Sequence, residues 1–184
     1  MEFRRLDIPD LVLFTPRRLV DARGWFAETF SARKFAEFGI DKIFVQNNHS
    51  LSCDRGTVRA LHFQLPPHDQ AKLVRVVRGA IYDVAVDLRR GSPTYGKHVE
   101  VMLTEKGGEQ LYVPNGFAHG FCTLEADTEV LYKVDRFYAP DFEGGIIWND
   151  PQLAISWPVK ASDAVLSDKD KTLRSFTGFD SPFA

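Results

Sequence analysis

The sequence contains little cysteine. Only two of its 184 residues are cysteines, Cys53 and Cys122, and they show neither the spacing of a metal site nor the number of a disulfide framework. Isolated thiols of this kind are typical of proteins in a reducing compartment. We therefore expect two unpaired thiols and a cytoplasmic location.

Long apolar runs and an excess of one charge are also missing. No segment approaches the roughly 18 apolar residues of a membrane-spanning helix, and the first ten residues are too charged for a secretory signal. The 23 Lys and Arg residues nearly balance the 25 Asp and Glu residues, which gives a net charge of −2. Because nucleic-acid binders usually carry a basic excess, we expect neither nucleic acid nor a membrane among the partners.

Apolar and aromatic residues are abundant. Hydrophobic residues make up 44% of the chain and aromatic residues 12%, with 15 phenylalanines. This composition supports a packed core and favours β-structure, and the length suits one domain, residues 1–184.

Short segments rich in β-branched and aromatic residues recur along the chain, separated by turn residues such as Pro66-Pro67 and Asn115-Gly116. This pattern predicts an all-β sandwich or barrel. One helix is predicted from Ser31, a possible cap, to Gly39, and a second short one at 166–170. The predicted strands are 11–14, 25–30, 43–47, 58–64, 72–78, 80–88, 98–103, 110–113, 117–124 and 128–134.

Two of the five histidines lie in informative surroundings. Residues 108–119 fit G-x5-P-x-G-x2-H, which resembles the second signature of the cupin superfamily, a jelly-roll family, and ends on His119. Metal-binding cupins carry His-x-His on an earlier strand, where this sequence has His62-Phe63-Gln64. Glutamine is a weak neutral ligand, so a metal site is the less favoured interpretation. We expect His68 and His98 to be exposed surface residues.

Two further strands carry polar groups on one face. Asp83 and Asp87 lie opposite Val84 and Val86, so they face either a ligand-holding interior or water, and the pattern alone favours water. Tyr132 shares a face with two valines, which by itself favours a packed core residue.

Several segments together resemble the dTDP-4-dehydrorhamnose 3,5-epimerase family. They include Arg-Ala-Leu-His-Phe-Gln at 59–64 and Pro-Asn-Gly-Phe-Ala-His-Gly-Phe at 114–121. The resemblance extends from about Asp21 to Asp170. Its one small departure is Ala60, where the family usually has glycine. The other matching segments are 21–28, 46–50, 72–74, 83–89, 132–133, 138–140, 143–144, 147–151 and 166–170.

The resemblance implies a metal-independent enzyme with a cupin-like jelly-roll fold and no cofactor. It also implies a homodimer, and a C-terminal segment (about 158–184) that completes the active site. It implies that His62 is the general base, oriented by Asp170, that Tyr132 is the proton donor, and that Lys72 lies near the developing oxyanion. Tyr138 matches the aromatic residue that stacks on thymine. The complete set of implied substrate-binding residues is Arg23, Phe26, Glu28, Gln46, Asn47, Asn48, Arg59, Asp83, His119, Tyr138, Glu143 and Lys169.

The implied substrate is dTDP-4-dehydro-6-deoxy-D-glucose, whose C4 ketone acidifies the hydrogens on C3 and C5. Inverting each centre requires a base and an acid on opposite sides of the ring. Three alternatives remain open at this point: an epimerase acting at one centre only, a metal-dependent cupin oxygenase or isomerase using His62 and His119, and a sugar-nucleotide binding module without activity.

Overall fold

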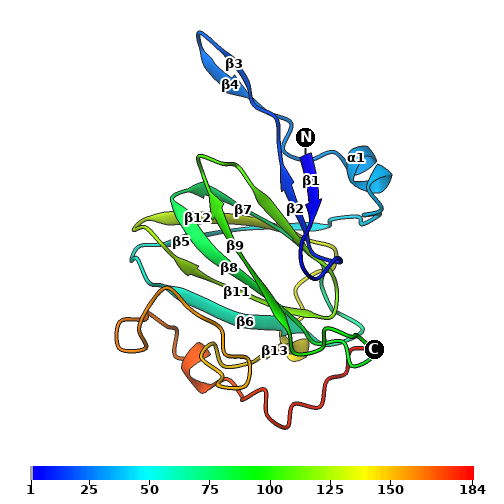
Figure 1. Cartoon of the computed structure of the whole chain (residues 1–184), viewed down its shortest axis with the longest axis vertical. Helices are drawn as coiled ribbons and strands as arrows, with labels where there is room; N and C mark the ends of the chain where they lie inside the picture. Colours follow the sequence, from blue (N-terminus) through cyan, green and yellow to red (C-terminus); the bar gives the residue numbers. More distant parts are fainter. Residues whose placement is uncertain (1) are drawn as a thin grey trace.

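Two antiparallel sheets face each other in the computed structural model, which describes residues 2–184 (Figure 1). This architecture confirms the predicted all-β, jelly-roll fold class. The first sheet has the order β1 (Glu2–Arg5), β2 (Val12–Thr15), β10 (Gln110–Val113), β7 (Lys72–Arg78), β12 (Thr128–Val134), β5 (Gln46–Ser52). The second has the order β13 (Glu143–Gly145), β6 (Val58–Gln64), β11 (Phe117–Thr123), β8 (Ala80–Asp87), β9 (His98–Thr104).

Most predicted strands are found close to their expected bounds, and the differences occur at sheet edges. The edge strand β5 begins at Gln46 rather than at residue 43, because its pairing with β12 runs from Gln46 opposite Val134 to Ser52 opposite Thr128. The predicted strand 25–30 is reduced to β4 (Gly24–Phe26), which pairs only with β3 (Leu19–Asp21). Strands β1, β3 and β13 were not predicted, since they are short and their sequences are charged or glycine-rich.

Helical structure is sparse. The first predicted helix is confirmed as α1 (Ala32–Glu37), which buries Phe35 and is followed by Gly39 at φ +89°. Ser31 stands at its N-cap position, although its side chain makes no capping hydrogen bond. The predicted helix at 166–170 is wrong: only a 3-10 turn, η2 (Asp170–Thr172), forms there. A second 3-10 turn, η1 (Pro140–Phe142), precedes β13.

The space between the sheets is filled unevenly. Apolar side chains such as Leu111, Leu103 and Ile81 form a buried cluster between β2 and β10 on one side and β8 and β9 on the other. Phe121 and Tyr132 lie at the border of this cluster. A cavity takes its place between the β7–β12–β5 side of the first sheet and the β13–β6–β11 side of the second.

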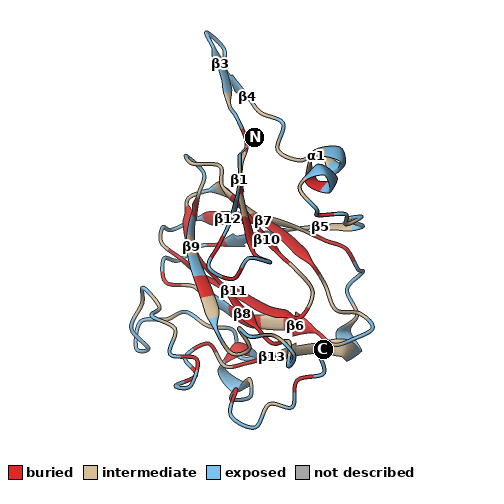
Figure 2. Cartoon of the chain, turned by 45° about the vertical axis from the view of Figure 1, so that its right-hand side comes forward, coloured by how far each residue is buried: buried red, intermediate tan, exposed pale blue. Residues whose placement is uncertain are grey.

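The C-terminal part of the chain covers the outer face of the second sheet. Trp148, Leu153, Phe176 and Phe183 pack there against residues of β6, β8 and β11. The buried strands therefore lie between this layer and the first sheet (Figure 2). Ala60 also belongs to this packing, and its methyl group occupies the position that a Cβ of Gly120 would need. The departure at Ala60 is thus accommodated by a glycine on the neighbouring strand.

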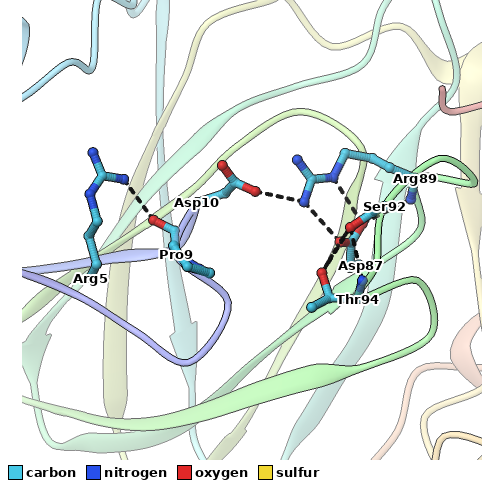
Figure 3. A network of polar contacts seen from close by, with 7 residues as sticks. All are labelled: Arg5, Pro9, Asp10, Asp87, Arg89, Ser92 and Thr94. Carbon is cyan, nitrogen blue, oxygen red and sulfur yellow. Dashed lines mark hydrogen bonds and ion pairs between the residues drawn. The ribbon is translucent and has the colours of Figure 1, made fainter.

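Asp87 is the centre of a polar network that joins the two sheets (Figure 3). Its buried carboxylate accepts hydrogen bonds from the side chains of Arg89, Ser92 and Thr94, and Arg89 also donates to Asp10 in the β1–β2 loop at 2.8 Å. Burial by itself would raise the pKa of Asp87, but these hydrogen bonds outweigh burial and lower that pKa. Asp83 is likewise fully buried, so the interpretation that this face of β8 meets water is wrong.

The β3–β4 hairpin stands away from the two sheets (Figure 1). Val20, Trp25 and Phe26 on this hairpin are exposed, with 79%, 55% and 69% of their surface accessible. Such an exposed apolar hairpin on a small protein is typical of a contact surface.

Among residues 2–184, no helix is long and apolar enough to cross a membrane.

Candidate active site

A cavity of about 620 Å³ lies between the two sheets. Most of the residues predicted from the sequence line it together. They are His62, Tyr132, Asp170, Lys72, Gln46, Asn48, Arg59, His119, Tyr138, Glu143 and Lys169. Strands β5, β6, β7, β11, β12 and β13, the loop between β12 and η1, and η2 with the residue before it contribute these residues.

His62 and Asp170 form a hydrogen-bonded pair in this cavity. The Nε2 atom of His62, on β6, lies 2.7 Å from Oδ1 of Asp170 in η2. Asp170 is buried, whereas His62 keeps about a quarter of its side chain accessible. A carboxylate in this position orients the ring, sets its tautomer and stabilises the imidazolium that forms when the ring accepts a proton. The predicted helix at 166–170 fails here because the Asp170 N–H bonds to Ser167 Oγ in a tighter turn.

Lys72 is the buried cation of the cavity. Its Nζ atom donates a hydrogen bond to the main-chain oxygen of His62 at 3.3 Å. Burial lowers the pKa of Lys72 to about 8, although the negative charges of Asp83 and Glu143 oppose this change. The amine is therefore still mainly protonated at neutral pH, and it can place a poorly solvated positive charge beside the base.

A second histidine–carboxylate pair lies on the neighbouring strands. His119 Nε2 is 2.9 Å from both carboxylate oxygens of Asp83, and His119 faces His62 across the β6–β11 ladder. Asp83 is fully buried behind His119 and does not line the cavity itself.

Tyr132 lines the cavity from β12, opposite β6. It packs on the apolar cluster through its ring, as its alternation with Val130 and Val134 predicts, and it also borders the cavity. Burial raises the pKa of the Tyr132 hydroxyl. The phenol is therefore protonated at neutral pH, which suits a proton donor.

One part of the cavity wall carries a chain of polar contacts. Tyr138 donates its hydroxyl hydrogen to Glu143 Oε2 at 3.0 Å, and Lys169 forms an ion pair with Glu143. Burial would raise the pKa of Glu143, but the hydrogen bonds from Lys169 and Tyr138 outweigh burial and lower that pKa. Arg59 donates to Ser52 Oγ and to the main-chain oxygen of Leu51, which holds its guanidinium at the wall.

Besides Asp83, four predicted residues lie outside the cavity of this chain. Arg23 and Phe26 are on the exposed β3–β4 hairpin, where Arg23 pairs with Asp21. Glu28 forms an ion pair with Lys34 of α1. Asn47 points to the face of β5 opposite that of Gln46 and Asn48, as the alternation of a strand requires.

Several cavity residues were missed by the sequence analysis. Ser50 and Gln64 could have been found, because each lies two residues along a strand from a predicted residue and so shares its face. The loop residues Thr57, Gln70 and Val165 carry no such signal, since long-range folding brings them to the wall. The remaining missed residues are Val58, Phe63, Phe121, Leu166 and Ser167.

The two cavity histidines and their neighbours differ from a cupin metal site in their contacts. Each imidazole directs Nε2 at a carboxylate, and the Gln64 amide is engaged with main-chain groups. Among residues 2–184, no group of three or more His, Cys, Asp or Glu side chains is arranged to hold a metal ion.

Contrary to expectation, His68 and His98 are only half-exposed, and His68 stacks on Phe142.

Comparison with known proteins agrees with this geometry. The profile of the dTDP-4-dehydrorhamnose 3,5-epimerase family matches residues 5–178. The chain belongs to this family. A dTDP-4-dehydrorhamnose 3,5-epimerase from Sinorhizobium fredii is 51% identical over 172 residues, which cover 94% of this chain and 88% of the relative. The family consists of isomerases, so the chain is an enzyme of the epimerase class.

Solved structures of epimerases share this fold. The Legionella pneumophila dTDP-6-deoxy-D-glucose-3,5-epimerase, solved in complex with dTDP-4-keto-L-rhamnose, has a TM-score of 0.94 and 40% identity, covering 100% of this chain and 98% of that one. A 3'-monoepimerase from Streptomyces bikiniensis, solved in complex with dTDP-quinovose, has a TM-score of 0.85 and 34% identity, covering 92% and 85%. The cupin-like fold is therefore shared by epimerases acting at one and at two centres.

Proposed function

We propose that this epimerase converts dTDP-4-dehydro-6-deoxy-D-glucose to dTDP-4-dehydro-L-rhamnose by inverting C3 and C5, without a metal or a redox cofactor. The observation that carries this proposal is the convergence of a base, an acid and a cation in one cavity. His62, held by Asp170, lies on one sheet, Tyr132 lies on the other, and Lys72 adjoins His62.

Each inversion breaks one C–H bond and forms another on the opposite face of the sugar ring. His62 accepts the proton from the carbon next to the C4 ketone, and the electron pair of that bond moves to O4 as an enolate. The Lys72 ammonium stabilises the negative oxygen in a poorly solvated site. Tyr132 then donates its proton to the carbon from the opposite side as O4 becomes a ketone oxygen again. The proton on His62 leaves to solvent, and the Tyr132 phenolate takes up a proton from solvent.

The nucleotide end of the substrate requires different contacts. Arg59 offers a planar guanidinium of the kind that binds pyrophosphate in a bidentate manner. Tyr138 presents an exposed ring at the cavity edge, on which a thymine base can stack. We assign the surrounding Gln46, Asn48, Glu143, Lys169 and His119 to substrate binding through their polar groups.

Turnover in heavy water tests this function directly. We expect two deuterons in the product, one on C3 and one on C5, because each reprotonation takes its hydrogen from solvent-exchanged groups. Mass spectrometry and proton NMR of the product, trapped with a dTDP-4-dehydrorhamnose reductase, measure both positions. Label on one carbon alone would make this chain a single-centre epimerase, and loss of activity with a chelator, restored by iron, would exclude the metal-free mechanism.

We also propose that the enzyme is a homodimer in which each copy completes the other's site. The apolar β3–β4 hairpin projects from the sheets, and β5 leaves one edge of the first sheet unpaired within this chain. Both are suited to pairing with a second copy. Arg23 and Phe26, which lie outside the cavity of their own chain, would then reach the nucleotide in the partner's cavity, with Glu28 and Asn47 near that contact.

Mixing two inactive variants separates this arrangement from a self-contained monomer. Arg23→Ala and His62→Ala are each expected to be impaired. After co-refolding in equal amounts, half of the dimers are mixed, and each mixed dimer holds one intact site, so roughly a quarter of wild-type activity should return. Sedimentation should show a dimer. A monomer, or no recovery of activity in the mixture, would contradict the proposal.

We further propose that residues 1–184 work as one domain in which the segment 158–184 supplies Lys169 and Asp170 to the site. The contacts of these two side chains with Glu143 and His62 support that role. The two free thiols, one exposed and one buried, are compatible with the reducing cytoplasm that we propose as its location.

A further inference from the structure

Gln64 is a buried polar side chain that the proposed mechanism does not use. It lies two residues after His62 on β6, faces the cavity and is only 4% exposed. Its amide makes three contacts with main-chain groups of two loops. Nε2 donates to the oxygen of His68 at 2.6 Å and to that of Phe137 at 3.3 Å, while Oε1 accepts from the N–H of Ala139 at 2.8 Å.

These contacts surround Tyr138 on both sides. Gln64 holds the carbonyl of the residue before Tyr138 and the N–H of the residue after it. The N–H of Tyr138 itself donates to Gln46 Oε1 at 3.0 Å. The two peptide groups on either side of the Tyr138 Cα are therefore held through three main-chain atoms, although the residue is 54% exposed.

Only a side-chain amide satisfies this arrangement. The site needs a donor for two carbonyl oxygens and an acceptor for one N–H within the same buried group. A carboxylate offers no donor at neutral pH, and an apolar side chain offers neither, so either would leave buried main-chain groups without partners. The residue type at position 64 thus follows from the loops that it holds.

We infer that Gln64 is a positioning residue that fixes Tyr138 for stacking on the base of the nucleotide. This inference rests on the proposed function, because it assigns Tyr138 to the thymine. Gln64 acts through the backbone of the 137–139 loop and does not touch the reacting carbons. Its loss therefore affects recognition of the base and leaves proton transfer at His62 and Tyr132 intact.

Calorimetry with dTDP and with inorganic pyrophosphate tests the inference. In Gln64→Met, of similar length without the amide, we expect the dissociation constant for dTDP to rise about 10-fold, because binding must then order the 137–139 loop that the amide holds in the wild type. Binding of pyrophosphate, which has no base, should be unchanged. Steady-state kinetics should show a raised KM with little change in kcat. The matched control is Gln152→Met, since the Gln152 amide contacts Thr177 away from the cavity and its loss should change none of these values.

A double-mutant cycle with Tyr138→Ala distinguishes positioning from general destabilisation. If Gln64 acts through the Tyr138 ring, Gln64→Met should add little to the loss of dTDP affinity already caused by Tyr138→Ala. Full additivity, or equal weakening of dTDP and pyrophosphate, would overturn the inference. Gln64→Leu, which also removes the amide and adds no charge to the cavity, serves as the second variant if Gln64→Met does not fold, and the same outcomes apply to it.

The wild-type protein separates failure of this inference from failure of the proposed function. If it does not bind dTDP and gives no deuterium incorporation with the dTDP-sugar, the proposed function is wrong. If it does both and Gln64→Met behaves like wild type, only the role of Gln64 is wrong.

Discussion

His62→Ala should reduce kcat by about 1,000-fold or more, because general acid–base groups contribute roughly 100- to 10,000-fold to such reactions. In the proposed mechanism both inversions begin with loss of a proton to this imidazole, so exchange of deuterium into unconverted substrate should disappear together with turnover. The dissociation constant for dTDP should change little, since the nucleotide contacts that we propose are made by Arg59 and Tyr138 and not by His62.

Asp170→Asn provides the graded control for this experiment. The amide can still contact His62 Nε2, but it does not stabilise the imidazolium, so we expect an intermediate loss of kcat. Single-turnover measurements and calorimetry with dTDP give the two readouts. Near-normal turnover in His62→Ala would remove His62 as the base, and loss of dTDP binding in a folded His62→Ala would place it in nucleotide binding instead.

Lys72→Met should show opposite effects on activity and on stability. Removing the cation beside the enolate should lower kcat about 100- to 1,000-fold, the range found when one oxyanion donor is removed. The same change should raise the melting temperature at pH 7. The buried ammonium costs folding free energy, up to about 3 kcal/mol for a pKa that falls from 10.5 to about 8.

The stabilising effect of Lys72→Met should depend on pH. Below pH 8 the lysine is protonated in the folded and the unfolded enzyme, so its burial penalty is present in full. Between about pH 8 and 10.5 the folded state holds fewer protons, so the free energy of unfolding rises with pH and the advantage of Lys72→Met should shrink.

The kcat of the wild-type enzyme should fall above about pH 8, as the cation is lost. Calorimetric melting and pH–rate profiles of both proteins measure these trends. A difference in melting temperature that is constant from pH 7 to 10 would contradict a titrating Lys72 in this cavity.

The strand pattern and the inward-facing residues were largely predictable from the sequence. Alternation along β8 and β12 placed Asp83 and Tyr132 on defined faces, because the side-chain period of a strand is two. The pattern did not decide whether the polar face of β8 meets water, since this depends on which sheet packs over it. The burial of Asp83 is explained only by the opposing sheet and by His119.

Local sequence patterns did not predict the contacts between segments that are distant in the chain. Asp170 reaches His62 across 108 positions of the chain, and the local sequence around it favoured a helix rather than the turn that presents its carboxylate. Only the family resemblance linked the two residues. The resemblance in turn implied Arg23 as a binding residue, which the geometry of a single chain leaves on the projecting hairpin.

The apolar cluster beside the cavity limits the routes by which a ligand can enter or leave the cavity. Leu111, Leu103 and their neighbours fill the interior behind Phe121, so the cavity has no second exit on that side. Under the proposed function, the arriving substrate and the departing product must therefore both pass through the part of the cavity wall that this cluster does not close.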